Sequence, residues 1–283
     1  MADTPTLAWQ PQQDVWLLLV VVVGGYFYAL SAWGPRQPRR RGAATRGQLT
    51  CFLAGAAGMW GGADWPIHPV GENYLYSVHM VQHLMFQLVA APLMILGVPA
   101  WLWRRLLAPR PVTALMRIVT RPLNALLLVG TYTAILHVPS VVDAVVTNGW
   151  LHLAAHVSLF AMSLVMWWPV LSPLPELPHL SYPGRMAYLF GHSILPTVPA
   201  SFLVFTQEPL YSAYANAPTV VSWLDPLADL HLAGLIMKIG GGLFLWGVIA
   251  ALFFRWHTEE ESGAPDLLYW RDLEGELEAS TQS

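Results

Sequence analysis

Two pairs of histidines, each with a spacing of four residues, stand in strongly apolar stretches of the sequence. His79 and His83 lie in HMVQHLMFQ, and His152 and His156 lie in GWLHLAAH. Residues i and i+4 share one face of an α-helix, about 6 Å apart along its axis. Two such pairs on facing helices can converge on one metal ion, as the histidines of HExxH helices do for zinc. We therefore predict a metal or haem site built from these imidazoles.

The composition indicates that these histidines lie in a membrane. Of 283 residues, 55% are hydrophobic and 11% are charged, whereas an ordinary soluble domain carries about 25% charged residues. Apolar blocks of about 20 residues, long enough to cross a bilayer core of about 30 Å as a helix, recur along the chain. The formal net charge of −3 and the lack of a basic tract give no reason to expect nucleic acid as a partner. The lipid bilayer is the expected surrounding.

The sequence predicts an all-α polytopic membrane protein, a bundle of seven transmembrane helices in a single domain (1–256), with an acidic cytoplasmic tail (257–283). The predicted spans are 14–33, 48–65, 74–103, 122–142, 149–171, 184–207 and 229–256. The third is too long for one straight crossing, and we expect Pro92 and Pro99 to bend it or end it early. The sixth contains Pro196 and Pro199, and we expect a kink there.

The distribution of positive charge predicts the orientation of the bundle. Every Lys and Arg except Lys238 lies in the loops after the first and third spans, at the start of the sixth span, or at the end of the seventh and beyond it. Cytoplasmic loops of membrane proteins accumulate Lys and Arg. We therefore expect the N-terminus outside, the C-terminus in the cytoplasm, and both histidine pairs in the outer part of the bundle.

Two further histidines are predicted at the same depth as the pairs. His137 lies near the outer end of the fourth span and His231 near the outer start of the seventh, so both are candidate ligands or partners of ligands. A single membrane histidine more often forms a helix–helix hydrogen bond. Six at one depth favour a metal or haem site, because ionisable groups within a membrane are costly without a function.

Other side chains near this depth are candidates for supporting roles. The thioether of Met80 would favour Cu(I) over harder ions. Asp64, Asp143 and Asp229 lie at the outer ends of spans, where they could attract a cation or orient imidazoles, although a polar outer surface explains each of them as well. Lys238 is a candidate participant from within the seventh span, and a lysine satisfied by carbonyl groups is at least as good an interpretation.

Four segments resemble the CtaG-type cytochrome c oxidase assembly factors, which are seven-helix bacterial membrane proteins. The segments are HMVQHLMFQLVAAPLMILGVP (79–99), ILHVPSVVD (135–143), HLAAHVSLFAMSLVMWWPVL (152–171) and DLHLAGLIMKIGGGLFLW (229–246). The resemblance covers about residues 50–256 and implies a protein of the bacterial plasma membrane that matures haem–copper oxidases. It also implies that the family's histidines are His79, His83, His137, His152 and His156. His231 departs from the pattern, in which glutamine is more common.

The residues and the resemblance together lead to one main hypothesis and two alternatives. We expect a copper chaperone or insertase without catalytic turnover, which holds copper with some of these histidines and passes it to the catalytic subunit of cytochrome c oxidase. The first alternative is a haem-binding protein, a haem carrier or electron-transfer protein that uses the same histidines. The second is a retinal photoreceptor based on Lys238, but the third span offers no Asp or Glu as a counter-ion.

Overall fold

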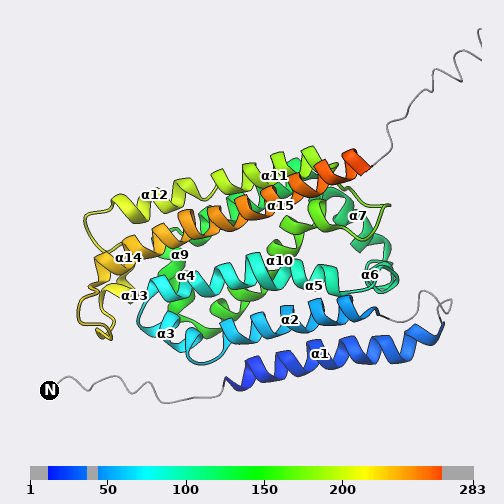
Figure 1. Ribbon diagram of the computed structural model, residues 1–283. Helices are drawn as coiled ribbons and strands as arrows, with labels where there is room; N and C mark the ends of the chain where they lie inside the picture. The colour runs from blue at the N-terminus through cyan, green and yellow to red at the C-terminus, as the bar shows by residue number, and fades with distance from the viewer. Residues whose placement is uncertain (1–11, 37–43, 263–283) are drawn as a thin grey trace, which may run out of the picture.

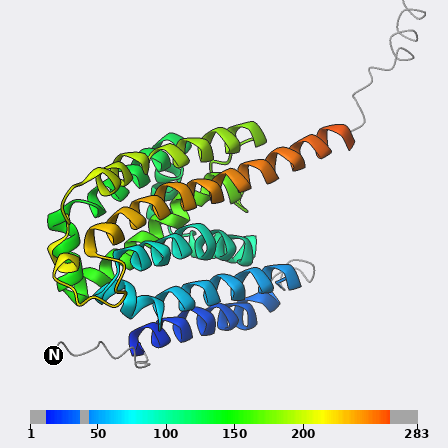
Figure 2. The same ribbon diagram turned by 60° about the vertical axis from the view of Figure 1, so that its left-hand side comes forward.

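The computed structural model describes residues 12–36 and 44–262, and the secondary structure of this part of the chain is entirely helical. Long helices run side by side along one common direction, with α1 at one edge of the bundle (Figure 1). A second view shows the same layered arrangement, with α15 extending beyond its neighbours (Figure 2). The predicted all-α fold is confirmed for these residues. The predicted tail lies outside the described residues from 263 onward.

Each predicted span coincides with a helix or a set of consecutive helices. These are α1 (Gln13–Trp33), α2 (Arg46–Ala63), α4–η2–α5 (Tyr76–Leu84, Met85–Ala90, Ala91–Gly97), α8 (Pro122–Leu136), α10 (Gly149–Leu171), α11 and α12 (Tyr182–Ile194, Thr197–Phe205) and α14–η3–α15 (Pro226–Leu235, Ile236–Gly240, Gly241–Ser262). Shorter helices connect them: η1 (Gly34–Arg36), α3 (Ile67–Asn73), α6 (Ala100–Leu106), α7 (Arg110–Val119), α9 (Pro139–Thr147) and α13 (Ser212–Ala215).

Several of these helices are long and apolar enough to cross a membrane. In the described part of the chain there are five: Val15–Trp33, Tyr76–Gly97, Gly149–Leu171, Tyr182–Phe205 and Pro226–Glu261. The pair α7–α8, bent by 84°, would make a sixth. The helix α2, rich in glycine and alanine, is not among them. The structure thus supports a multi-pass membrane protein, while seven crossings and the orientation remain predictions.

Prolines end or interrupt several of the predicted spans. Helix α5 ends at Gly97, and Pro99 precedes α6, so the third span is shorter than predicted. Pro92 instead lies within a continuous helix, directly after the π-helical turn η2. The sixth span breaks at Pro196, between α11 and α12. Helix α8 ends at Leu136, before the predicted end at 142, because the chain turns and Pro139 begins α9.

Close helix packing supports the half of the bundle that carries the histidines. Helix α5 approaches α2 so closely that a Cβ atom on Gly97 would lie 2.4 Å from the backbone nitrogen of Phe52. Tyr26 of α1 stacks on Phe52 and donates a hydrogen bond to the carbonyl oxygen of Gly97 (3.0 Å). The largest apolar cluster lies among α5, α8, α10, α11 and α15, and includes the fully buried Trp167 and Trp168. The helices α4 and α10 therefore stand in a packed scaffold.

Candidate metal centre

The structure brings the two histidine pairs together, one from α4 and one from α10. Within each pair the ring centroids are 4.1 Å apart for His79 and His83, and 4.3 Å apart for His152 and His156. Across the two helices, the centroid of His156 lies 5.4 Å from that of His83 and 5.9 Å from that of His79. The helical period of each segment places both of its rings on one face, and helix packing makes the two faces meet.

Three of these imidazoles form a group that we call the inner triad: His79, His83 and His156. One ring nitrogen of each lies within 4.8 Å of the corresponding nitrogens of the other two. Nδ1 of His79 and Nε2 of His83 and His156 are buried and have no hydrogen-bond partner among the described residues. A buried polar atom without a partner costs about 1–3 kcal/mol. The residues therefore fit a metal ion, since one ion could satisfy all three nitrogens.

A second group, which we call the outer triad, consists of His68, Glu72 and His152. Nε2 of His68 lies 3.1 Å from one carboxylate oxygen of Glu72, and Nδ1 of His152 lies 2.8 Å from the other. The amide nitrogen of Gln82, which is fully buried, lies 2.9 Å from Nδ1 of His68. Burial raises the pKa of Glu72, but hydrogen bonds and positive charge from His152 and His68 outweigh it and hold that pKa well below its usual range.

The sequence did not lead us to assign His68 and Glu72 to the site. Their spacing of four residues in IHPVGEN was a usable signal, because it places both side chains on one face of the short helix α3. That signal alone does not show what α3 packs against, so the assignment depends on the tertiary structure.

Gly71 explains how α3 comes to lie against the histidine pair of α4. A Cβ atom at Gly71 would lie 2.8 Å from the backbone nitrogen of His79 and 2.9 Å from its Cα atom. The hydroxyl of Tyr214 donates a hydrogen bond to the carbonyl oxygen of Gly71 (2.9 Å). Only glycine permits this approach, which carries His68 and Glu72 to the edge of the inner triad.

Asp229 of α14 determines where α4 begins. Its carboxylate accepts hydrogen bonds from the backbone nitrogens of Tyr76 (2.6 Å) and Ser77 (3.3 Å), and from the hydroxyl of Ser77. The residue before α4, Leu75, provides no side-chain cap. An acceptor at a helix N-terminus satisfies otherwise unpaired N–H groups and interacts favourably with the helix dipole. Asp229 therefore positions the helix that carries His79 and His83 and does not itself belong to either triad.

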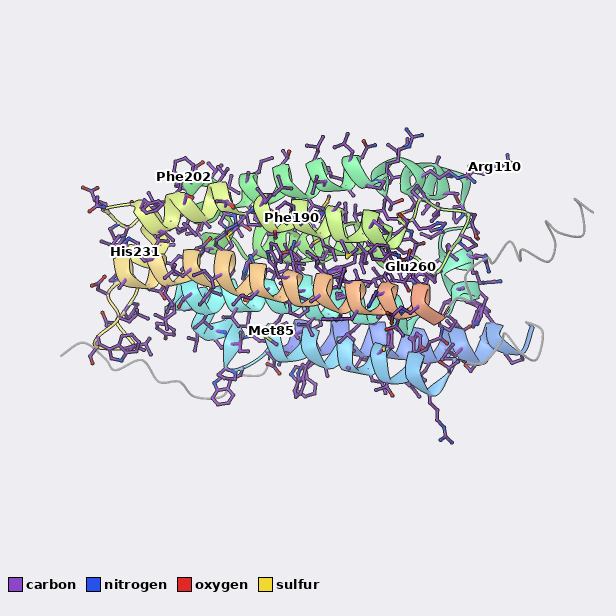
Figure 3. The ribbon with its side chains drawn as sticks, turned by 45° about the horizontal axis from the view of Figure 1, so that its top comes forward. Met85, Arg110, Phe190, Phe202, His231 and Glu260 are labelled. Atoms are coloured by element: carbon purple, nitrogen blue, oxygen red, sulfur yellow. The ribbon has the colours of Figure 1, made fainter. Side chains whose placement is uncertain are left out.

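The other histidines predicted for the site differ in their placement. The Nδ1 of His137 donates to the carbonyl oxygen of Thr133 (2.7 Å), so its Nε2, which is buried and unpartnered, carries the free lone pair. His137 borders a small cavity together with the four paired histidines. His231 lies apart from both triads, where its Nε2 donates to the carbonyl oxygen of Thr206 (3.0 Å). Figure 3 shows His231 at the end of the molecule opposite Arg110.

Asp64 and Asp143 also make local contacts away from both triads. Asp64 is buried and accepts a hydrogen bond from the indole nitrogen of Trp60 (2.9 Å). Asp143 accepts from the hydroxyl of Ser212 (2.7 Å) and from the backbone nitrogen of Ala213 (3.1 Å), at the start of α13. Both carboxylates thus stabilise the end of the bundle that is predicted to face outward.

Met80 and Lys238 belong to neither triad. Met80 is buried in an apolar cluster with Tyr76 and Met237. Lys238 donates to the carbonyl oxygen of Ser193 (3.0 Å) and to the hydroxyl of Thr197 (2.6 Å), and so bridges the break between α11 and α12. Neither side chain makes a hydrogen bond or an ion pair with a triad in the described residues.

Three cavities adjoin the histidines. The first, about 20 Å³, is lined by His79, His83, His137, His152 and His156. The second, about 60 Å³, lies deeper and is bordered by His83, His137 and His192 and by the thioethers of Met80, Met166 and Met237. The third, about 320 Å³, lies between α1, α2 and α10, and we call it the side cavity; His68, Glu72, His152 and His156 are on its wall. The side cavity is the widest of the three, and it reaches all of the outer triad but only His156 of the inner triad.

Comparison with known proteins gives a family match over most of the chain. Residues 24–259 match the family described as cytochrome c oxidase caa3 assembly factor (Caa3_CtaG). Uncharacterized proteins of Mycobacterium bovis and Mycobacterium tuberculosis are each 25% identical over 287 residues, which covers 92% of this chain and 42% of each relative. An uncharacterized protein of Mycobacterium leprae is 25% identical over 233 residues, 76% of this chain and 35% of the relative. The chain thus spans less than half the length of these relatives, and no solved structure matches it.

Proposed function

Because the chain belongs to the family of cytochrome c oxidase caa3 assembly factors, we propose that it assists the assembly of a haem–copper oxidase in the bacterial plasma membrane. In this proposal copper is the cargo. The inner triad binds it near the outer end of the bundle, and the protein passes it to the catalytic subunit of the oxidase. The role consists of binding and release, without catalytic turnover of a substrate.

The observation that carries the proposal is the convergence of three imidazoles from two helices, each of which has a buried nitrogen without a partner. Imidazole is a good ligand for copper, and three protein ligands leave a position open for an incoming donor. A client protein can start ligand exchange at that open position, so the copper moves without first dissociating into water. The free Nε2 of His137, on the same small cavity, is available as a fourth ligand.

The deeper cavity supports copper over other ions that imidazole binds. Three thioethers, those of Met80, Met166 and Met237, border it together with His83. Thioethers favour Cu(I) over harder cations. Apolar packing is enough to explain each methionine taken singly. Because all three lie beside a histidine of the inner triad, we include them in the proposal as candidate soft ligands for copper.

The geometry supports copper more strongly than haem. The cavity enclosed by the paired histidines and His137 has about 20 Å³, and about 10–15 Å³ of such space holds one water molecule. An ion fits this space, whereas a porphyrin would have to separate α4 from α10. Because haem produces an intense Soret absorption band, an absorbance spectrum of the purified protein distinguishes the two ligands.

The test of this proposal is the copper content of the purified full-length chain and of the double variant His79→Ala/His83→Ala. We expect the wild-type protein to bind copper in near-stoichiometric amounts after incubation and desalting. The double variant should lose at least one equivalent, because two of the three ligands of the inner triad are gone. Metal analysis by mass spectrometry measures both.

His231→Gln is a matched control, because it changes a histidine outside both triads and glutamine can still donate to the carbonyl of Thr206. It should bind as much copper as the wild type. Unchanged copper content in the double variant, at the same elution volume and melting temperature as the wild type, would contradict the proposal. A Soret band that is present in the wild-type protein and absent from the double variant would identify the ligand as haem instead of copper.

A further inference from the structure

We infer that the outer triad is a second copper site, through which copper passes on its way to the inner triad. This inference rests on the proposed function for the identity of the metal and adds a separate site with a different ligand set. Its ligands are Nε2 of His68, Nδ1 of His152 and the carboxylate of Glu72, which lie within 4.8 Å of one another. Two imidazoles and one carboxylate are a common ligand set for a divalent metal.

The ligand atoms of the outer triad already point at one another. The two carboxylate oxygens of Glu72 face one histidine each, at 3.1 Å and 2.8 Å. Protons on the two ring nitrogens fill these contacts when no cation is bound. A cation at the centre of the triad takes the place of those protons, and a neutral imidazole then carries its proton on the other ring nitrogen.

Gln82 can support either arrangement of protons on His68. Its amide nitrogen lies 2.9 Å from Nδ1 of His68, and its amide oxygen is buried without a partner in the described residues. If the amide rotates by half a turn, its oxygen accepts a hydrogen bond from the protonated Nδ1, and Nε2 of His68 is free to bind a cation. A hydrogen bond to the second ring nitrogen is the usual way in which proteins orient a histidine ligand.

Charge and access distinguish the outer triad from the inner one. Glu72 provides a negative charge that attracts a cation, whereas the inner triad consists of neutral imidazoles alone. The side chains of His68 and Glu72 are 12% and 25% exposed, and both lie on the wall of the side cavity. A cation arriving from the outer surface therefore meets a charged, partly open site before it meets the inner triad.

The histidine pair of α10 connects the two triads. His152 belongs to the outer triad and His156 to the inner triad, with ring centroids 4.3 Å apart. Both border the side cavity and also the small cavity beside His79 and His83. Copper can therefore move between the triads by ligand exchange, in which one imidazole replaces another and the oxidation state of the metal does not change. The spacing of four residues on α10 gives one ligand to each site.

The test is a Cu²⁺ titration of the full-length chain in detergent, with bound copper counted by metal analysis and the ligand type read from electron paramagnetic resonance. We expect two equivalents in the wild type, with spectra of two different ligand sets. Glu72→Gln should bind one equivalent, that of the inner triad. Its loading should slow by about tenfold or more, the scale on which fixed charge changes association rates.

His68→Gln is the second variant, because it removes one ligand of the outer triad and leaves the carboxylate in place. It should also bind one equivalent, at wild-type melting temperature, and His231→Gln should keep two. If the wild type binds one equivalent and Glu72→Gln keeps it at the same rate, the outer triad is only a hydrogen-bonded pair of histidines and the inference is wrong. The double variant His79→Ala/His83→Ala distinguishes the two proposals, because it should retain the outer copper and lose the inner one.

Discussion

Two groups of ionisable side chains lie within the predicted spans, and they differ in whether their polar atoms have partners. Lys238 donates to the carbonyl oxygen of Ser193 and to the hydroxyl of Thr197. In the inner triad, by contrast, one buried nitrogen of each ring has no partner among the described residues. Both groups are costly to place in a membrane. The protein offsets that cost with hydrogen bonds for Lys238, whereas the histidines require another group to satisfy them.

Lys238 and the inner triad both lie at or next to a π-helical turn, so the local backbone conformation does not distinguish them. Only their hydrogen-bond partners do. The π-helical turn η2 begins two residues after His83, and η3 contains Lys238 itself. Such turns are frequent at functional sites, so by this criterion both groups would be candidates. Lys238 instead bridges the break at Pro196, where the end of α11 leaves backbone carbonyl groups unpaired. A π-helical turn here accompanies a structural lysine as readily as a metal site.

Lys238→Met should have the largest effect on the stability of the copper-free protein, without changing copper binding. Methionine keeps the length of the side chain but removes the hydrogen bonds to Ser193 and Thr197 at the helix break. Because a hydrogen bond to a charged group contributes about 1.5–3 kcal/mol, we expect a loss of about 2 kcal/mol. Thermal unfolding in detergent measures the loss, and metal analysis measures the copper. A loss of copper together with intact stability would place Lys238 with the histidines.

His83→Leu should have the opposite effects. Leucine fills a similar volume without a buried, unpartnered nitrogen, so the copper-free variant should be as stable as the copper-free wild type or more stable by about 1 kcal/mol. The same variant should lose the copper of the inner triad and the thermal stabilisation that bound copper gives the wild type, about 2.7 kcal/mol at a free copper concentration of 100 times Kd. Unfolding curves with and without copper test both statements. A variant less stable than the wild type without copper would show that Nε2 of His83 has a partner.

The sequence predicted the half of the candidate site that depends on helical period, and the structure was needed for the half that depends on packing. The pairs on α4 and α10 could be found because four residues make about one turn, whatever the helices contact. His68 and Glu72 could not be assigned, because their position depends on the close approach of Gly71 to His79. Asp229 was predicted near the outer start of the seventh span, but only the structure shows that it caps α4. Likewise, the prolines predicted that the third and sixth spans are interrupted. They could not predict that Lys238 bridges the break in the sixth span.

The smallest effect is expected for the exposed ion pair between Arg104 and Glu176, which gives a reference for both buried groups. Nε of Arg104 donates to one carboxylate oxygen of Glu176 at 2.5 Å, and this hydrogen bond holds the pKa of Glu176 below its ordinary value. A carboxylate with a lowered pKa stabilises the folded protein above its unfolded pKa, and this stabilisation is lost as the pH falls through the folded pKa. Solvent screens the pair, so Glu176→Gln should cost at most about 0.5 kcal/mol near neutral pH. The difference between variant and wild type should vanish in acid and in high salt, as unfolding curves across pH would show. If Glu176→Gln lost as much stability as Lys238→Met, exposure to solvent would not weaken this ion pair. The presence or absence of hydrogen-bond partners would then not be enough to explain why Lys238 and the histidines differ.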